Sequence, residues 1–239
     1  MPGGFLAVCA ARNDTLVQSF LAVHYAVHIQ TIATQTHGRY LVRDGPPDRL
    51  LLGFHGYAQN ADIHMADLET IPGIGEWTVV AVQALNRFYM GRSTETSACW
   101  MTRQDRELVI GDNINYVRAV AAEFAEARTI VVEGFSQGAA MAYRAAANLD
   151  RVAGVLILGG DLPPDVDSPL PPLLIGRGED DEWYTDEKLK NDLKSLAGRA
   201  RVETAVFKGR HEWADGFRSA AGEFLSRVLT GQHVDESAP

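Results

Sequence analysis

The sequence TIVVEGFSQGAAMAYRAAANL, Thr129 to Leu149, contains the pattern that decides the fold. Its first seven residues are mostly apolar and predict a buried strand, whereas the alanine-rich segment that begins at Gln137 predicts a helix. Between them lies Gly134-Phe135-Ser136-Gln137-Gly138, a G-x-S-x-G motif in the strand–turn–helix setting of a nucleophile elbow. Glycines two positions before and after the serine allow the close backbone approach of such a turn. We therefore predict that Ser136 is a nucleophile rather than an ordinary helix cap.

The same alternation of short apolar runs and helical-period segments extends to both sides of this stretch. It predicts an α/β fold in which a mostly parallel central sheet carries helices on both faces. Strands are expected at Ile29–Thr34, Arg39–Val42, Arg49–Phe54, Trp77–Ala84, Thr129–Phe135, Val152–Leu158, Leu173–Gly176 and Val202–Lys208. Helices are expected from the N-cap Asp112 onward, and at Gln137–Leu149, Asp186–Ala197 and Ala214–Val228.

Length and composition fit one large domain with a packed core. The chain has 239 residues, of which 46% are hydrophobic and 22% are charged, close to the averages of globular proteins. We predict a single domain over residues 29–230, an N-terminal segment of uncertain role at 1–28 and a mobile polar tail at 231–239.

Charge and cysteine content limit the partners and the compartment. The formal net charge of −9 opposes binding to nucleic acids and stable association with anionic membranes. No stretch approaches the roughly 18–20 consecutive apolar residues of a membrane span. The two cysteines, Cys9 and Cys99, exclude a disulfide framework, and we interpret them as reduced thiols in a cytoplasmic protein.

A serine nucleophile requires a base. In hydrolases that carry a nucleophile elbow, the three groups follow one another in the chain in the order serine, acid, histidine. Only His211 and His233 follow Ser136, and His233 lies in the polar tail. His211 comes directly after the last predicted strand, so it should reach the same sheet edge as Ser136, because sites gather at the carboxyl ends of parallel strands. We predict that His211 is the base rather than a solvent-exposed loop histidine.

The acid should lie between the serine and the histidine, on the loop after a strand. That loop carries four adjacent carboxylates, and composition alone does not choose among them or exclude a merely solvated acidic turn. The four are Glu179, Asp180, Asp181 and Glu182.

Four motifs together resemble the phospholipase/carboxylesterase branch of the α/β-hydrolase superfamily, which includes acyl-protein thioesterases. They are His55-Gly56-Tyr57, Gly134-Phe135-Ser136-Gln137-Gly138, Arg177-Gly178-Glu179-Asp180-Asp181 and Gly209-Arg210-His211. The similarity covers roughly Ile29 to Val228 and implies the α/β-hydrolase fold.

The resemblance also implies roles for individual residues. In that family the acid stands three residues after the glycine of a His-Gly pair. Here Arg177-Gly178 takes that place, which points to Asp181 and leaves Asp180 as the alternative. The backbone amides of Tyr57 and Gln137 would form the oxyanion hole. His55 is interpreted as bracing the loop rather than as a second base.

The long connection after the strand ending near Ala84 supplies candidate pocket residues. Trp100, Phe88 and Met90 are apolar or aromatic and are predicted to line a pocket for an apolar part of the substrate, with core packing as the alternative. Glu133 is a carboxylate within an otherwise apolar strand and needs a hydrogen-bonding partner if it is buried.

These observations predict a serine esterase or thioesterase that forms an acyl-enzyme with small, largely apolar esters or thioesters and needs no cofactor and no metal. His24 and His28 have helical i, i+4 spacing, but no third ligand accompanies them. The alternative is a non-catalytic binding protein of the same fold. The sequence leaves the natural acyl group and the oligomeric state open.

Overall fold

A computed structural model describes residues 28–231 of the chain. These residues belong to two compact units, one that runs to Gln35 and one that begins at Thr36. Every described helix and strand lies in the second unit. Residues 28–35 are exposed and adopt neither helix nor strand. Cys9, His24 and the tail from 232 onward lie outside the described residues.

The second unit is built on a seven-stranded sheet in the order β1-β3-β2-β6-β7-β8-β9. Its strands are β1 (Arg39–Arg43), β2 (Arg49–Phe54), β3 (Thr78–Gln83), β6 (Thr129–Phe135), β7 (Val152–Leu158), β8 (Leu173–Gly178) and β9 (Val202–Phe207). Only the edge strand β1 runs antiparallel to its neighbour within this sheet. The predicted mostly parallel sheet is confirmed.

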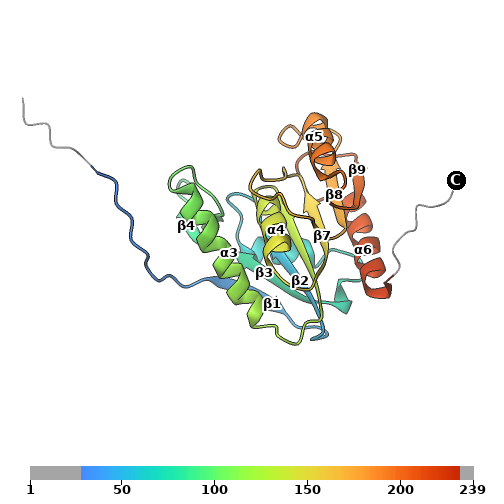
Figure 1. The fold of residues 1–239 in the computed structure, drawn as a ribbon, viewed down its shortest axis with the longest axis horizontal. Helices are drawn as coiled ribbons and strands as arrows, with labels where there is room; N and C mark the ends of the chain where they lie inside the picture. Colours follow the sequence, from blue (N-terminus) through green and yellow to red (C-terminus); the bar gives the residue numbers. More distant parts are fainter. Residues whose placement is uncertain (1–27, 232–239) are drawn as a thin grey trace, which may run out of the picture. The chain divides into compact units, whose positions relative to one another are not determined.

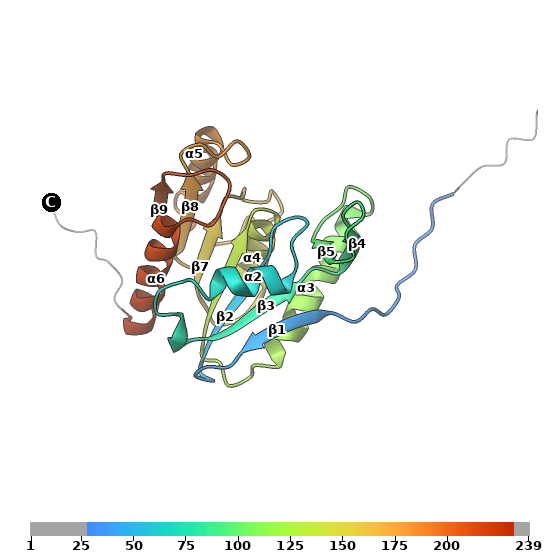
Figure 2. The same cartoon turned by 180° about the vertical axis from the view of Figure 1, so that it is seen from behind.

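Helices cover both faces of this sheet, as the sequence predicts. Figure 1 shows α3 (Arg106–Ala122) and α4 (Gln137–Asn148) in front of the strands, with α5 (Asp186–Leu196) beside β8. Figure 2, the view from behind, shows α2 (Ala61–Leu68) and α6 (Asp215–Thr230) on the opposite face. A short 3-10 turn, η1 (Ile74–Glu76), precedes β3.

Alternation along the buried strands divides the core into two clusters. Leu50 and Leu52 pack with the residues of α3, α4 and α5, whereas Leu51 packs with those of α2 and α6. Successive side chains of a strand point to opposite faces, so a continuous apolar run is what a sheet covered on both sides requires.

Two expectations about the first half of the chain are wrong. Ile29–Thr34 forms no strand, and Ile29 and Ile32 are about nine-tenths exposed. Helix α3 begins at Arg106 after the N-cap Asp105, so the predicted cap Asp112 lies within the helix. The first turn of α3 is largely exposed, with Leu108 about half exposed, which explains why the search for a buried apolar face placed the start about two turns too late.

The connection between β3 and α3 contains a hairpin of β4 (Asn86–Tyr89) and β5 (Thr96–Cys99) that the sequence did not predict. Ala98 exchanges backbone hydrogen bonds with the segment after β2: its amide donates to Gln59 O at 2.8 Å, and its carbonyl accepts from the amide of Ala58 at 3.0 Å. The hairpin therefore lies beside the loop that begins with His55. Cys99, at its end, is a buried free thiol.

Candidate active site

The turn between β6 and α4 holds Ser136 in a strained backbone conformation. Its φ of 54° and ψ of −116° lie outside the regions that non-glycine residues commonly occupy. A Cβ on Gly134 would lie 2.3 Å from Gly138 O, and one on Gly138 would lie 1.9 Å from Phe54 O. The two glycines therefore let the start of α4 lie directly against the end of β2, as the predicted elbow requires.

Replacing Gly138 by alanine is expected to destabilise the protein by about 3 kcal/mol, because the new methyl group must displace backbone rather than a flexible side chain. Urea unfolding monitored by circular dichroism measures this loss. Gly111→Ala is the matched control: Gly111 lies inside α3 with no atom within 4 Å of its hypothetical Cβ, so alanine should stabilise by roughly 0.5–1 kcal/mol. Equal stabilities of the two variants would contradict the close approach.

Ser136, His211 and Asp181 form a continuous hydrogen-bonded series. His211 Nε2 lies 2.8 Å from Ser136 Oγ, and His211 Nδ1 lies 2.8 Å from Asp181 Oδ2. The three residues follow β6, β9 and β8, whose carboxyl ends meet at one edge of the sheet. The imidazole also packs against Phe135, with ring centroids 5.0 Å apart. The arrangement allows Nε2 to accept the serine proton while Nδ1–H donates to the carboxylate.

The structure distinguishes Asp181 from the neighbouring carboxylates. Asp181 is buried, and its second oxygen, Oδ1, accepts the backbone N–H groups of Trp183 and Tyr184, each at 2.8 Å. Asp180 is exposed, and its backbone amide donates to Gly209 O. Asp181 is therefore the carboxylate that faces His211, with its orientation fixed by two main-chain donors.

A second buried carboxylate connects this loop to the one after β7. Asp192 Oδ2 accepts from the Tyr184 hydroxyl at 2.9 Å and from the Leu162 backbone amide at 3.1 Å. Burial raises the pKa of Asp192, and these two hydrogen bonds partly oppose that shift. The segment that carries Asp181 and the segment that contains Leu162 are thus fastened to the same side chain of α5.

His55 braces the loop after β2. Its Nδ1 donates to Gly56 O at 2.7 Å, its Nε2 accepts from the amide of Ala84 at 3.0 Å, and its carbonyl accepts from Trp100 Nε1 at 2.9 Å. Burial lowers the pKa of His55 to about 4, so the ring is neutral at pH 7. Both ring nitrogens are engaged, which leaves His55 no role as a base and supports the bracing interpretation.

Tyr57 and Gln137 line a neighbouring hollow that Phe88 also lines, and Gln137 directly follows Ser136 in the chain. Neither of their backbone amide nitrogens donates a hydrogen bond to any other described residue. For Gln137 this follows from its place in the first turn of α4, where helix amides lack partners within the helix. Its side chain anchors the segment after β5, since Oε1 accepts from Trp100 N at 2.7 Å and Nε2 donates to Met101 O at 3.1 Å.

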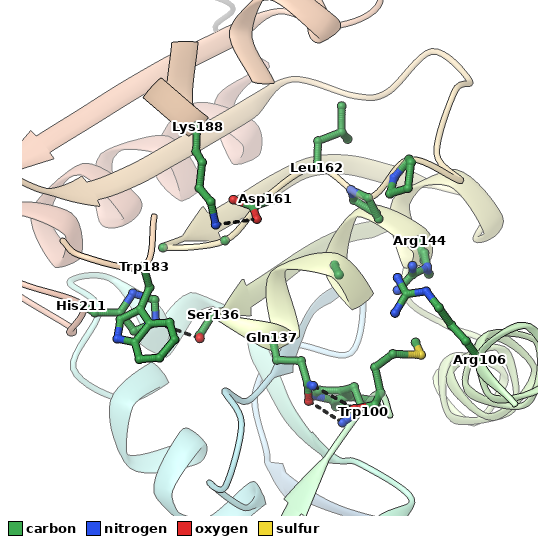
Figure 3. Close-up of a pocket in the computed structure, with 16 residues that line it drawn as sticks. Trp100, Arg106, Ser136, Gln137, Arg144, Asp161, Leu162, Trp183, Lys188 and His211 are labelled. Carbon is green, nitrogen blue, oxygen red and sulfur yellow. Dashed lines mark hydrogen bonds and ion pairs between the residues drawn. The ribbon is translucent and has the colours of Figure 1, made fainter. Parts of the chain in front are cut away.

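A cavity of about 440 Å³ opens beside Ser136 and His211 (Figure 3). Trp100 lines it from a fully buried position, where it also packs edge-on against Phe54 at 5.5 Å. Both of the roles considered for Trp100, pocket wall and core packing, thus apply. Phe88 lines the neighbouring hollow instead. Met90 is half-exposed near the turn of the β4–β5 hairpin and lines neither space.

Four charged residues in the cavity wall were not predicted from the sequence. They are Arg106, Arg144, Asp161 and Lys188. Lys188 Nζ pairs with Asp161 at 3.0 Å, whereas the two arginines come from α3 and α4. Nothing in the spacing of these residues indicates a common site, because helix packing alone brings them together. Trp183, also missed, is 73% exposed at the rim, two residues after Asp181.

The buried carboxylate of Glu133 has a partner, His64 of α2, whose Nε2 lies 2.8 Å from Glu133 Oε2. Burial raises the pKa of Glu133 well above its usual value and lowers that of His64 to about 4. Both shifts favour the uncharged pair, in which the carboxyl group donates to the imidazole. The pair lies in the core behind the elbow and does not contact Ser136 through any described hydrogen bond.

Residues 28–231 show neither a metal-ligand cluster nor a membrane-spanning helix. This part of the chain has no cluster of three or more histidine, cysteine or carboxylate side chains arranged to hold a metal ion. None of its helices combines the length and hydropathy that a membrane crossing requires.

The sequence matches no protein-family model and no curated protein at a significant level. Solved structures do resemble it. A carboxylesterase from Bacillus cereus aligns with a TM-score of 0.63 over 80% of this chain and 94% of its own, at 16% identity. A phospholipase/carboxylesterase from Dyadobacter fermentans gives a TM-score of 0.63 over 82% and 99%, at 18% identity. Acyl-protein thioesterase 2 from Zea mays gives 0.63 over 81% and 100%, also at 18% identity.

These similarities extend over nearly the whole of the other chains and therefore concern the complete domain rather than a shared motif. They agree with the observed strand order and with helices on both faces of the sheet. The chain has the α/β-hydrolase fold.

Proposed function

We propose that this protein is a serine esterase or thioesterase, similar in activity to the carboxylesterases and thioesterases whose fold it shares. The observation that carries the proposal is the hydrogen-bonded series Asp181–His211–Ser136, which opens directly onto a cavity large enough for a small substrate. Fold alone supports many functions, so the site rather than the fold is the argument.

The first half of the reaction forms an acyl-enzyme. Ser136 Oγ attacks the carbonyl carbon of an ester or thioester while His211 Nε2 removes its proton. The resulting imidazolium is stabilised by Asp181 through Nδ1–H. His211 then gives the proton to the departing alcohol or thiol, and the acyl group remains bound to Ser136.

The amides of Gln137 and Tyr57 are the proposed donors to the negatively charged oxygen of the tetrahedral intermediate. Their lack of partners among the described residues supports this role, as does the place of Gln137 directly after Ser136 in the chain. The positive end of the α4 dipole adds to the stabilisation of an anion there. Because both donors are main-chain groups, side-chain substitutions at these positions change the rate less than the loss of a donor would.

The second half of the reaction repeats the same steps with water. His211 removes a proton from a water molecule, which attacks the acyl carbonyl, and the proton then returns to Ser136 Oγ as the acid leaves. No cofactor takes part in either half, since the side chains supply the nucleophile, the base and the acid.

A serine-reactive fluorophosphonate probe tests this function against the alternative of a non-catalytic binding protein. An activated serine is expected to be phosphonylated within minutes at micromolar probe, with Ser136 as the modified residue in a peptide map. Ser136→Ala is the control and should not be labelled. Labelling that is absent from the native protein, or that persists in Ser136→Ala at the same rate, would reject the esterase and favour a binding protein.

A further inference from the structure

The cavity beside Ser136 has an uneven distribution of charge. Its wall combines apolar residues, such as Trp100, Leu162 and Pro163, with polar and charged ones, and an ion pair of Lys188 with Asp161 lies at one side. Figure 3 shows the guanidinium groups of Arg106 and Arg144 on the side of the cavity away from His211. The same cavity therefore contains the nucleophile and, on another side, two cationic groups.

Arg144 is a buried cation in which one terminal nitrogen, Nη1, has no hydrogen-bond partner among the described residues. Its side chain is only 2% exposed, and it holds Asp165 through two bonds, Nε to Oδ2 at 2.7 Å and Nη2 to Oδ1 at 2.6 Å. No hydrogen bond within the described residues uses its Nη1. The hydrogen bond from Arg144 is the main cause of the lowered pKa of Asp165, to which the charge of Arg106 also contributes. The guanidinium group is thus fixed in place before any ligand arrives.

Arg106 carries a positive charge that is not paired with any described carboxylate. It lies in the first turn of α3 and makes no ion pair or hydrogen bond with any described side chain. Two arginines and one carboxylate, Asp165, leave one positive charge in excess at this end of the cavity, while Lys188 and Asp161 balance each other. This local excess of positive charge contrasts with the formal net charge of −9 of the whole chain.

We propose that this end of the cavity binds a carboxylate carried by the substrate, so that the preferred substrates are esters or thioesters with an anionic group remote from the reacting carbonyl. The inference rests on the proposed function and specifies its substrate class. One unit of excess charge matches a single carboxylate, and guanidinium forks bind carboxylates in a fixed geometry. Apolar residues of the wall, such as Leu162 and Pro163, can pack against a short hydrocarbon spacer.

Two pairs of esters test the proposal, each differing only in charge. On the acyl side, p-nitrophenyl hydrogen adipate is compared with methyl p-nitrophenyl adipate. On the alcohol side, the butanoyl ester of 4-hydroxybutanoate is compared with that of its methyl ester in a pH-stat. In at least one pair, kcat/KM should favour the carboxylate by roughly 10–100-fold, the strength of one hydrogen bond to a charged group.

The discrimination ratio is defined as kcat/KM for the anionic ester divided by kcat/KM for its methyl ester. This ratio, rather than the rate with either ester, reports on Arg106. Arg106→Gln should bring the ratio to about 1, mainly through a higher KM for the anionic ester, and Arg106→Lys should keep part of it. Arg103→Gln removes an equal charge three residues away. Arg103 lines the neighbouring hollow with Phe88 but not the wall of the cavity, so the ratio of this variant should equal that of the native protein. A fall in the ratio with Arg103→Gln as large as with Arg106→Gln would show a long-range field and overturn the proposed contact.

A binding measurement separates this inference from the proposed function. Calorimetric titration of methyl hydrogen adipate into Ser136→Ala protein should show at least roughly tenfold weaker binding when Arg106→Gln is added. Turnover of the neutral esters with no preference in either pair would overturn the carboxylate site and leave the esterase intact. Arg106-dependent binding in a protein that hydrolyses no ester would overturn the esterase and leave the carboxylate site intact.

Discussion

Replacing Ser136 by alanine lowers kcat/KM for a short-chain p-nitrophenyl ester by roughly 10⁴–10⁶-fold, because Ser136 carries the only hydroxyl among the residues that line the cavity. The residual rate reflects binding and the main-chain donors alone. The side chain makes a single described hydrogen bond, to His211, so the midpoint of thermal unfolding should change by less than about 3 °C. Steady-state kinetics and calorimetry on the same preparation measure the two effects.

Ser195→Ala provides the control for this substitution. Ser195 lies on α5 and donates only to Asn191 O in the same helix, so its loss should leave kcat/KM within about twofold of the native value. An alanine variant at Ser136 that keeps more than about a tenth of the activity would show that another nucleophile carries out the reaction.

Replacing Asp181 by asparagine lowers kcat by roughly 10³–10⁴-fold, although the two side chains have nearly the same shape. Oδ1 of Asp181 accepts two backbone N–H groups, so an asparagine must place its carbonyl oxygen there and turn its NH₂ group toward His211 Nδ1. That contact favours the tautomer in which Nδ1 accepts and Nε2 carries the proton. In this tautomer His211 cannot remove the proton of Ser136.

Asp180→Asn is the matched control, since it changes the adjacent carboxylate in the same loop. Asp180 is exposed and its side chain makes no described hydrogen bond, so kcat should stay within about twofold of the native value. The resemblance of this loop to the family motif pointed to Asp181 and kept Asp180 open. A larger loss in Asp180→Asn than in Asp181→Asn would reverse the assignment.

Local patterns predicted the elements that are buried on both faces. The strand Thr129–Phe135 and the helix starting at Gln137 have the predicted bounds, because a continuous apolar run followed by a glycine-flanked serine and alanines leaves few alternatives. The strand predicted at Ile29–Thr34 does not form although its β-branched residues suit a strand, because a strand also needs a partner and the pattern contains no information on one.

The sequence alone did not predict the contacts between segments that are far apart in the chain. The β4–β5 hairpin depends on the backbone bonds between Ala98 and the loop after β2, some forty residues earlier. Arg106 and Arg144 reach the cavity because α3 packs against α4, and neither helix signals this in its own sequence. The sequence therefore predicted an apolar pocket, whereas the cavity wall also contains charged groups.

The shared attachment of two loops to Asp192 limits how the proposed substrate range of this protein could be altered. The Asp192 carboxylate accepts hydrogen bonds from the Leu162 amide, in the cavity wall, and from the Tyr184 hydroxyl. The Tyr184 amide in turn donates to Asp181, the acid of the proposed site. Grafting a different 159–164 segment to admit bulkier acyl chains would disturb the orientation of Asp181 as well. Directed evolution of selectivity at this wall should therefore select compensating changes along α5 before turnover recovers.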